Sequence, residues 1–278
     1  MTTNDVVRIA AVSDLHYSKT SQGALLPLFA EITNSADVLV VAGDLTDYGL
    51  AEEAKLLAKD LTSALKIPAV GVLGNHDYEA GEEKEIARIL QDAGVRMLDG
   101  DTCEVHGVGF AGVRGFCGGF GRGALGAWGE GVIKAFVHEA ISEALKLESA
   151  LARLKTEHRI AIVHYAPIRE TVEGEPLEIY PFLGSSRLEE PLTRYEVSAV
   201  FHGHAHKGTL EGTTAKGIPV YNVSLPLLRE ERPGQPTFRV LELRHGVGAA
   251  QREPDRITER RRAAGRRLDD RFAQTGSD

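Results

Sequence analysis

The 278-residue chain is long enough for one large domain or two small ones, and its 42% apolar and 26% charged residues are ordinary for a soluble globular protein. Its formal net charge of −8 disfavours a protein that wraps nucleic acid, because such binding needs basic surface to neutralise phosphates. No run approaches the roughly 18 apolar residues that a membrane helix needs, and the N-terminus lacks the pattern of a signal peptide. We therefore expect a cytoplasmic protein with no membrane partner.

The first hundred residues alternate strand-like and helix-like patterns. Short runs rich in β-branched residues predict strands at Val6–Val12, Val38–Ala42 and Ala69–Leu73. Apolar residues at helical spacing predict helices at Leu25–Ile32, Ala51–Leu65 and Glu82–Leu90. The alternation of short apolar strands with helices indicates βαβ units around a largely buried sheet.

A glycine-rich segment, Gly107–Gly131, comes next, and eleven of its 25 residues are glycine. It is followed by a long predicted helix, at about Val132–Thr156, with an apolar stripe. Further strands are predicted at Ile160–Val163, Val197–Phe201, Ile218–Asn222 and Thr237–Leu243. No strong linker divides these segments, so we expect one α/β domain over residues 1–248, with two sheets packed face to face and helices outside.

The last segment, residues 249–278, has eight arginines, six acidic residues and few large apolar ones. This composition indicates a solvated tail or a surface helix. The alternative is an anionic partner for Arg260, Arg261 and Arg262, which nothing else in the sequence supports.

Polar clusters follow five of the predicted strands. They contain Asp14, His16, Asp44, Asp47, Asn75, His76, Asp77, His164, His204 and His206. In α/β sheets, ligands gather outside the carboxyl ends of the strands, so these groups can converge on one rim although they lie far apart in the chain. Carboxylate, imidazole and amide side chains suit hard-to-borderline divalent metals. The two cysteines, Cys103 and Cys117, show no metal-binding spacing.

The order D-x-H, G-D-x-x-D, G-N-H-D, H, G-H-x-H, over residues 14–206, resembles that of the calcineurin-like metallophosphoesterase superfamily. The resemblance implies a four-layer α/β/β/α sandwich with a dinuclear metal site at the carboxyl ends of the strands. It implies that Asp14, His16 and His206 hold the first metal. It assigns Asn75, His164 and His204 to the second metal, with Asp44 as the bridge. Such centres use two divalent ions of Mn, Fe, Zn, Co or Ni, and the sequence does not choose among them.

The implied reaction is phosphoester hydrolysis, by in-line attack of a hydroxide that bridges the metals. His76, next to the ligand Asn75, is expected to protonate the leaving alkoxide as general acid. In the family, the second Asp of G-D-x-x-D, here Asp47, pairs with that histidine and holds it charged and oriented. A helix-capping role for Asp47 is the simpler alternative and does not exclude the pairing. His202 alternates with His204 and could support that ligand.

The motifs narrow the substrate only in part. Protein Ser/Thr phosphatases of the superfamily carry a phosphate-gripping arginine where this chain has Tyr48, and a glutamate where it has Asp77, so this activity is disfavoured. The pattern is similar to that of class III cyclic-nucleotide phosphodiesterases, and also to that of many broad-range phosphodiesterases and phosphatases. We expect a phosphodiesterase that acts on nucleotide-like or other small phosphodiesters, with a phosphomonoesterase as the alternative.

The segment Gly107–Gly131 is the first candidate for substrate specificity. It could form a mobile lid, with Arg114 or Arg122 binding phosphate. The alternative is a long surface loop or an oligomer contact. The stretch Tyr165–Ser186, after His164, is a second candidate for the rim of the site.

Two other function classes fit the sequence less well. A nuclease of the same superfamily would normally show extra capping segments and basic surface, which the net acidity of this chain disfavours. A non-catalytic scaffold would be expected to have lost ligands or the acid histidine, and all of these residues are present here. A small phosphoester is thus the expected partner, and the sequence leaves an oligomer open.

Overall fold

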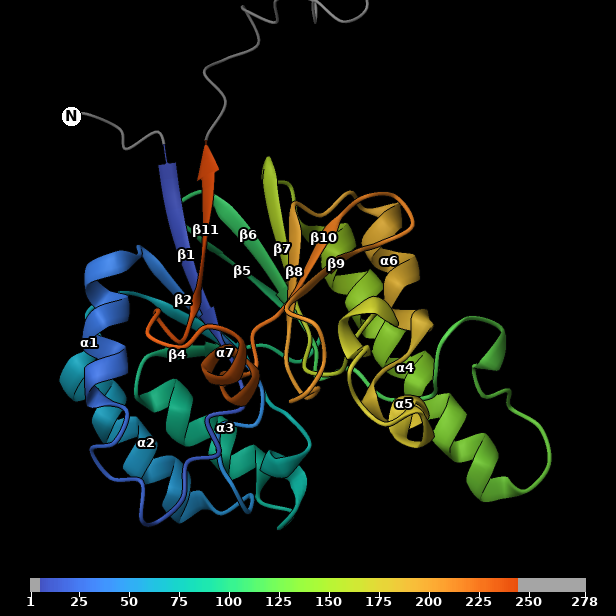
Figure 1. Ribbon diagram of the computed structural model, residues 1–278, viewed down its shortest axis with the longest axis horizontal. Helices are drawn as coiled ribbons and strands as arrows, with labels where there is room; N and C mark the ends of the chain where they lie inside the picture. Colours follow the sequence, from blue (N-terminus) through green and yellow to red (C-terminus); the bar gives the residue numbers. More distant parts are fainter. Residues whose placement is uncertain (1–5, 245–278) are drawn as a thin grey trace, which may run out of the picture. The chain divides into compact units, whose positions relative to one another are not determined.

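Two β-sheets organise residues 6–244, the part of the chain that this computed structural model describes (Figure 1). The first sheet has the strand order β11 (Arg239–Arg244), β1 (Val6–Val12), β2 (Val38–Ala42), β3 (Ala69–Val72) and β4 (Val95–Met97). Strands β1 to β4 are parallel, and β11 pairs antiparallel with β1. The predicted tail at 249–278 and the domain boundary after residue 248 lie outside the described residues.

The second sheet has the strand order β5 (Asp101–Val105), β6 (Val108–Gly112), β7 (His158–Ile162), β8 (Ala199–His202), β10 (Pro219–Asn222) and β9 (Glu211–Thr213). Its four inner strands are parallel, and the edge strands β5 and β9 run antiparallel to their neighbours. Parallel inner strands place the carboxyl ends of β7 and β8 at one rim of this sheet.

Alternate residues of the central strands contact different apolar layers. In β1, Ile9 and Ala11 belong to the core between the sheets, whereas Ala10 and Val12 pack with the helices on the outer face of the first sheet. In the second sheet, Ile162 faces the core between the sheets and Ala161 faces the helices outside. A strand buried on both faces reads as a continuous apolar run, which is why these strands were predictable.

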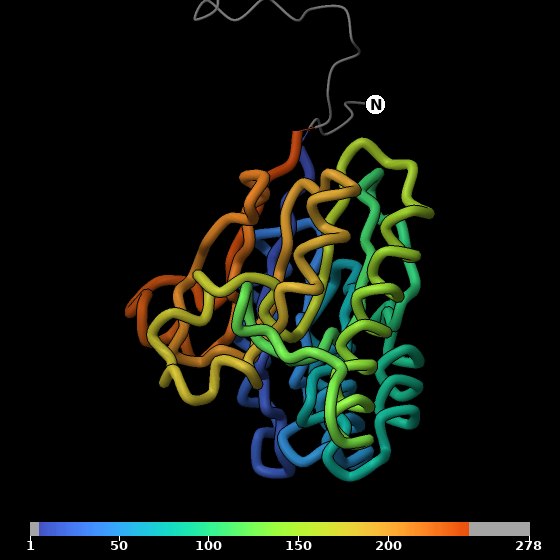
Figure 2. The backbone as a smooth tube through the Cα atoms, turned by 90° about the vertical axis from the view of Figure 1, so that its right-hand side faces the viewer, coloured from blue at the N-terminus to red at the C-terminus, as the bar shows by residue number. Residues whose placement is uncertain are grey.

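Helices cover both outer faces (Figures 1 and 2). The first sheet packs against α1 (Leu26–Ser35), α2 (Ala51–Ala64) and α3 (Glu83–Asp92). The second sheet packs against α4 (Gly131–Arg153) and α6 (Glu189–Arg194), which lie toward the viewer in Figure 2. The short helices α5 (Tyr180–Leu183) and α7 (Leu225–Glu231) complete the set. This layer order is α/β/β/α, and it confirms the predicted sandwich.

The glycine-rich segment Gly107–Gly131 is the main difference from the prediction. Its first part, Val108–Gly112, is not a loop but the buried inner strand β6. A Cβ at Gly112 would lie 2.7 Å from Val72 Cγ1 and 3.0 Å from Leu98 Cβ, so glycine is needed here because the two sheets approach closely. The prediction of a lid or surface loop was therefore wrong for residues 108–112.

No helix among residues 6–244 is long and apolar enough to cross a membrane. The cytoplasmic location stays a prediction.

Candidate metal centre

Five loops at the carboxyl ends of β1, β2, β3, β7 and β8 bring the predicted ligands together. Six of the predicted ligands form two groups of three donor atoms, each with its atoms within 4.8 Å of one another. One contains Asp14, His16 and His206, and the other contains Asp44, His164 and His204. Asn75 joins the second group, because its Oδ1 lies 2.9 Å from His164 Nε2. All seven predicted ligands thus lie in two adjacent half-sites.

The first half-site is centred on the buried carboxylate of Asp14. His206 Nε2 lies 3.0 Å from Asp14 Oδ1, and the backbone N–H of His204 donates to the same carboxylate at 3.1 Å. His16 completes the group with Nε2, a buried nitrogen that has no hydrogen-bond partner. Buried polar atoms are almost always paired, so an orphaned nitrogen that faces a carboxylate cluster fits a metal ligand.

The second half-site is built around the fully buried ring of His164. Its Nδ1 donates to the carbonyl oxygen of Ala42 at 2.9 Å, and its Nε2 lies 3.3 Å from Asp44 Oδ1. His204 Nε2 donates to the carbonyl oxygen of Phe182 at 3.1 Å, which leaves Nδ1 for a ligand. Backbone acceptors of this kind orient metal-binding imidazoles.

Asp44 lies between the half-sites. Its Oδ1 faces His164, whereas Oδ2 lies 3.9 Å from His16 Nε2 in the other half-site. The backbone N–H of His76 also donates to Oδ1, at 2.9 Å. One carboxylate therefore has an oxygen directed at each half of the centre.

Four of the seven residues have a left-handed backbone, which L-residues other than glycine rarely adopt: φ is +55° at Asp14, +43° at His16, +49° at Asp44 and +70° at His204. Strained residues of this kind cluster at functional sites, because the surrounding structure must hold them in place. The residues directly before three of the ligands are glycines, because there is no space for a side chain at these positions. A Cβ at Gly43, Gly74 or Gly203 would collide with His164, Asp44 or Asp14, respectively.

The charges of the buried groups depend on one another. Burial alone would lower the pKa of His164, but the carboxylates of Asp44 and Asp14 raise it to about 9. Burial opposes the ionisation of Asp14, yet its hydrogen bond with His206 and the charge of His164 hold its pKa well below the usual range. For His204, burial and the nearby His164 lower the pKa to about 4. Two buried carboxylates thus require positive charge beside them, which divalent ions would supply.

His76 and Asp47 lie at the edge of the first half-site. The rings of His76 and His16 meet edge-on with centroids 4.5 Å apart. His76 Nδ1 donates to the main-chain carbonyl oxygen of Asp47 at 2.7 Å. The Asp47 carboxylate instead lies 3.3 Å from His16 Nδ1. The expected contact between His76 and Asp47 exists, but the main chain makes it and not the carboxylate.

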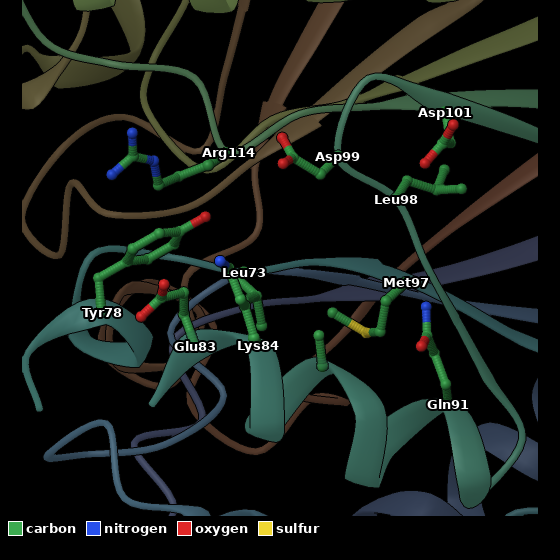
Figure 3. A pocket seen from close by; sticks show the side chains of 11 residues that line it. Leu73, Tyr78, Glu83, Lys84, Gln91, Met97, Leu98, Asp99, Asp101 and Arg114 are labelled. Carbon is green, nitrogen blue, oxygen red and sulfur yellow. The ribbon is translucent and has the colours of Figure 1, made fainter. Parts of the chain in front are cut away.

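The two arginines predicted to bind phosphate lie outside these groups. Arg114 Nη2 pairs with Glu139 at 2.6 Å, and its guanidinium stacks on the ring of Tyr78, 4.4 Å from the centroid. Figure 3 shows Arg114 and Tyr78 together at a small cavity of about 170 Å³ between α3 and the start of the second sheet. Arg122 lines a separate groove of about 610 Å³, together with Arg169. A phosphate-binding role stays a prediction for both Arg114 and Arg122.

Two further buried residues near the centre, Asp77 and His202, are not among the seven predicted ligands. Asp77 accepts hydrogen bonds from the backbone N–H groups of Leu45, Thr46 and Gly74 and thereby ties the loop after β2 to the loop after β3. Burial and the nearby Asp44 raise the pKa of Asp77 to about 6. The four-residue motif G-N-H-D was the only sequence signal for it.

His202, which could have supported His204, is a buried residue whose ring nitrogens contact other groups. Its Nδ1 donates to the carbonyl oxygen of Gly203 and its Nε2 accepts from Thr171 Oγ1, both at 2.8 Å. Burial lowers the pKa of His202 to about 4, so the ring is neutral.

A two-sheet sandwich with histidines and carboxylates at the strand ends is the arrangement expected of a metallophosphoesterase. The chain belongs to the calcineurin-like phosphoesterase family, whose model matches residues 7–208. It is accordingly a phosphoester hydrolase. A curated relative, the probable glycerophosphodiester phosphodiesterase GpdQ of Arcobacter nitrofigilis, is 24% identical over 226 residues, which cover 72% of this chain and 71% of the relative.

Two solved structures share the fold. The phosphopantetheinyl hydrolase of Mycobacterium tuberculosis is 17% identical with a TM-score of 0.60, over 89% of this chain and 98% of that one. The protein TT1561 of Thermus thermophilus is 16% identical with a TM-score of 0.52, over 87% of this chain and 100% of that one.

Proposed function

We propose that this protein is a phosphodiesterase for small phosphodiesters and that seven residues hold its two divalent metal ions. The main support is the convergence of seven side chains from five loops into two adjacent half-sites that share Asp44. In this proposal, Asp14, His16 and His206 would hold the first ion. Asn75, His164 and His204 would hold the second, and Asp44 would be shared by both. The donor set of carboxylate, imidazole and amide suits Mn, Fe, Zn, Co or Ni.

Bound divalent ions supply Lewis-acid chemistry: they lower the pKa of a water and neutralise charge on the phosphoryl oxygens. The chain itself supplies the proton for the leaving group. In its imidazolium form, His76 donates Nδ1–H to the carbonyl oxygen of Asp47. Nε2 can then donate its proton to the leaving oxygen as general acid, which leaves the ring neutral.

Charge balance favours a diester over a monoester. A phosphomonoester carries about 1.5 to 2 negative charges at neutral pH and gains from an additional cation. Arg114 is neutralised by Glu139, and Arg122 lies in a groove whose lining includes none of the seven proposed ligands. A diester, with a single negative charge, depends less on such a cation. The relative GpdQ, named as a probable glycerophosphodiester phosphodiesterase, agrees with this choice.

The substrate class can be tested by comparing two chromogenic esters in the presence of Mn²⁺. We expect kcat/KM for bis-p-nitrophenyl phosphate to exceed that for p-nitrophenyl phosphate. A panel of 2′,3′- and 3′,5′-cyclic nucleotides and glycerophosphodiesters would then identify the leaving group. A clear preference for the monoester would contradict the proposal.

The roles of His76 and Asp44 predict different losses. His76→Ala should keep its metal and lose about 10²- to 10⁴-fold in kcat with a poor leaving group, because proton transfer to the alkoxide contributes about that much. It should lose far less with p-nitrophenolate, which leaves without a proton. Asp44→Ala should lose metal and activity together. Equal loss on both leaving groups in His76→Ala would rule out the acid role.

A further inference from the structure

Asp47 has two contacts, and they reach different histidines. Its carboxylate Oδ1 lies 3.3 Å from His16 Nδ1. Its main-chain oxygen accepts from His76 Nδ1 at 2.7 Å. Removal of the Asp47 side chain would therefore keep the acceptor of His76 and remove the carboxylate beside His16 Nδ1.

The contact with His16 follows from the backbone. Hydrogen bonds from the N–H of His16 to the oxygen of Asp44 (3.1 Å) and from the N–H of Tyr17 to the oxygen of Leu45 (3.0 Å) continue the parallel pairing of β1 and β2 into their loops. The N–H of Asp47 then donates to the oxygen of Tyr17 at 3.2 Å. Asp47 is thereby held next to His16 by main-chain bonds and not only by a side-chain rotamer.

The proton on His16 decides what its ring can bind. A neutral imidazole carries one N–H, and the nitrogen without it can bind a metal. A carboxylate at Nδ1 retains the proton there and leaves the lone pair on Nε2. This Nε2 is the buried nitrogen without a hydrogen-bond partner, and it lies 3.9 Å from Oδ2 of Asp44, the proposed bridging ligand. His16 also forms a donor group with Asp14 and His206.

We infer that Asp47 is a positioning residue for the metal ligand His16: its carboxylate accepts the Nδ1 proton, orients the ring and presents the Nε2 lone pair to the first metal. The inference rests on the proposed metal centre and changes the expected task of Asp47, which was to keep His76 charged. Carboxylate–histidine pairs of this type raise the basicity of the ligand.

The same contacts argue against a further metal ion at this edge, although donor atoms of His16, Asp47 and His76 lie within 4.8 Å of one another. If Nε2 of His16 binds the first metal, the ring proton is on Nδ1. Nδ1 then has no lone pair with which to bind a further ion. Nδ1 of His76 is occupied by the main chain. One main-chain hydrogen bond and one carboxylate–imidazole contact therefore fit these three residues better than a metal site.

The test measures the affinity of the protein for Mn²⁺ by calorimetric titration after chelation. Three variants are compared with the wild type: Asp47→Ala, Asp47→Asn and Glu79→Ala. We expect Asp47→Ala to weaken binding of one Mn²⁺ by about 10- to 100-fold, as loss of a ligand-orienting partner typically does. Asp47→Asn should weaken it less, because the amide oxygen still accepts from Nδ1. Glu79→Ala is the control: Glu79 Oε2 lies 3.8 Å from His76 Nδ1, so this variant removes a negative charge beside His76 and should bind Mn²⁺ as the wild type does.

Activity at saturating Mn²⁺ provides the second measurement. Both Asp47 variants should keep the wild-type ratio of rates between a good and a poor leaving group, unlike His76→Ala. The inference is overturned if Asp47→Ala binds Mn²⁺ normally, or if Asp47→Asn loses rate only with the poor leaving group, since Asp47 would then act through His76. If Asp47→Ala does not fold, the ratio for Asp47→Asn decides. Failure of the wild type to bind Mn²⁺ would instead overturn the proposed metal centre itself, together with this inference.

Discussion

Gly43, directly before the proposed bridging ligand Asp44, has two reasons to be glycine. Its φ is +89°, and a Cβ there would collide with the ring of His164. Gly81 shares only the first reason, because its φ is +73° and a Cβ would meet nothing within 4 Å. The two positions therefore separate the cost of backbone conformation from that of displacing a ligand.

We predict that Gly81→Ala lowers the free energy of unfolding by about 1 to 2 kcal/mol, the cost of a left-handed L-residue, and leaves Mn²⁺ affinity unchanged. Gly43→Ala should cost more and also weaken Mn²⁺ binding, because His164 must move. Urea unfolding and calorimetric titration measure the two effects. Normal Mn²⁺ binding by Gly43→Ala would show that His164 is not held by this contact.

Because of the buried ring of His202, we predict that the free energy of unfolding falls in acid. Its folded pKa of about 4 lies below the ordinary value of 6.5, because burial disfavours the charged ring. Between these values the unfolded chain takes up a proton that the folded chain does not, so stability falls as the pH falls from about 6.5 to 4.

At about 1.4 kcal/mol per pKa unit, the loss should reach about 3 kcal/mol. Urea unfolding in chelator at pH 7 and pH 4 should thus show a larger decrease for the wild type than for His202→Gln, which has no titrating ring at this position. Equal decreases would mean that His202 does not contribute.

At the scale of elements, the strand β6 shows how composition can mislead. Glycines at positions 109 and 112 indicated a loop, yet a Cβ at Gly109 would crowd Leu154, and one at Gly112 would crowd Val72 and Leu98. Glycines are required in β6 because the layers pack closely there. The spacing of glycines in the sequence does not distinguish this requirement from that of a turn.

Two aromatic residues of the glycine-rich segment test this difference. Phe110 in β6 is 0% exposed, whereas Trp128 in the following loop is 72% exposed. We predict that Phe110→Ala lowers the free energy of unfolding by about 3 to 5 kcal/mol, and that Trp128→Ala changes it by less than about 0.5 kcal/mol. Similar small effects of both substitutions would argue that residues 108–112 do not form a core strand.

At the scale of the whole molecule, the proposed centre joins the two sheets through ligands from β1, β2 and β3 on one side and β7 and β8 on the other. Metal that binds only the folded chain stabilises it by about 2.7 kcal/mol per site at 100 times Kd. Chelation should therefore lower the Tm by about 5 to 10 °C per site, given about 2 to 4 °C per kcal/mol in a chain of this size. Calorimetry with and without chelator measures this shift, and Asp44→Ala should abolish it. A wild-type Tm that chelator does not change would contradict the proposed centre.

The family, the strands buried on both faces and the order of polar motifs at strand ends could all be recognised before the fold was known. These features depend on neighbouring residues in the chain. An apolar run indicates a buried strand, and glycine next to an acidic residue or histidine indicates a turn. The sequence could therefore predict seven ligands and the α/β/β/α layers, but not which atoms meet.

Three features became clear only in the folded chain: the Asp47 carboxylate contacts His16, Arg114 pairs with Glu139, and β6 is a strand. These outcomes depend on the register of neighbouring strands and on the distance between two packed sheets. Both are set by contacts between residues far apart in the chain, such as Asp14 with His206, whose separation of 192 positions leaves no trace in local spacing.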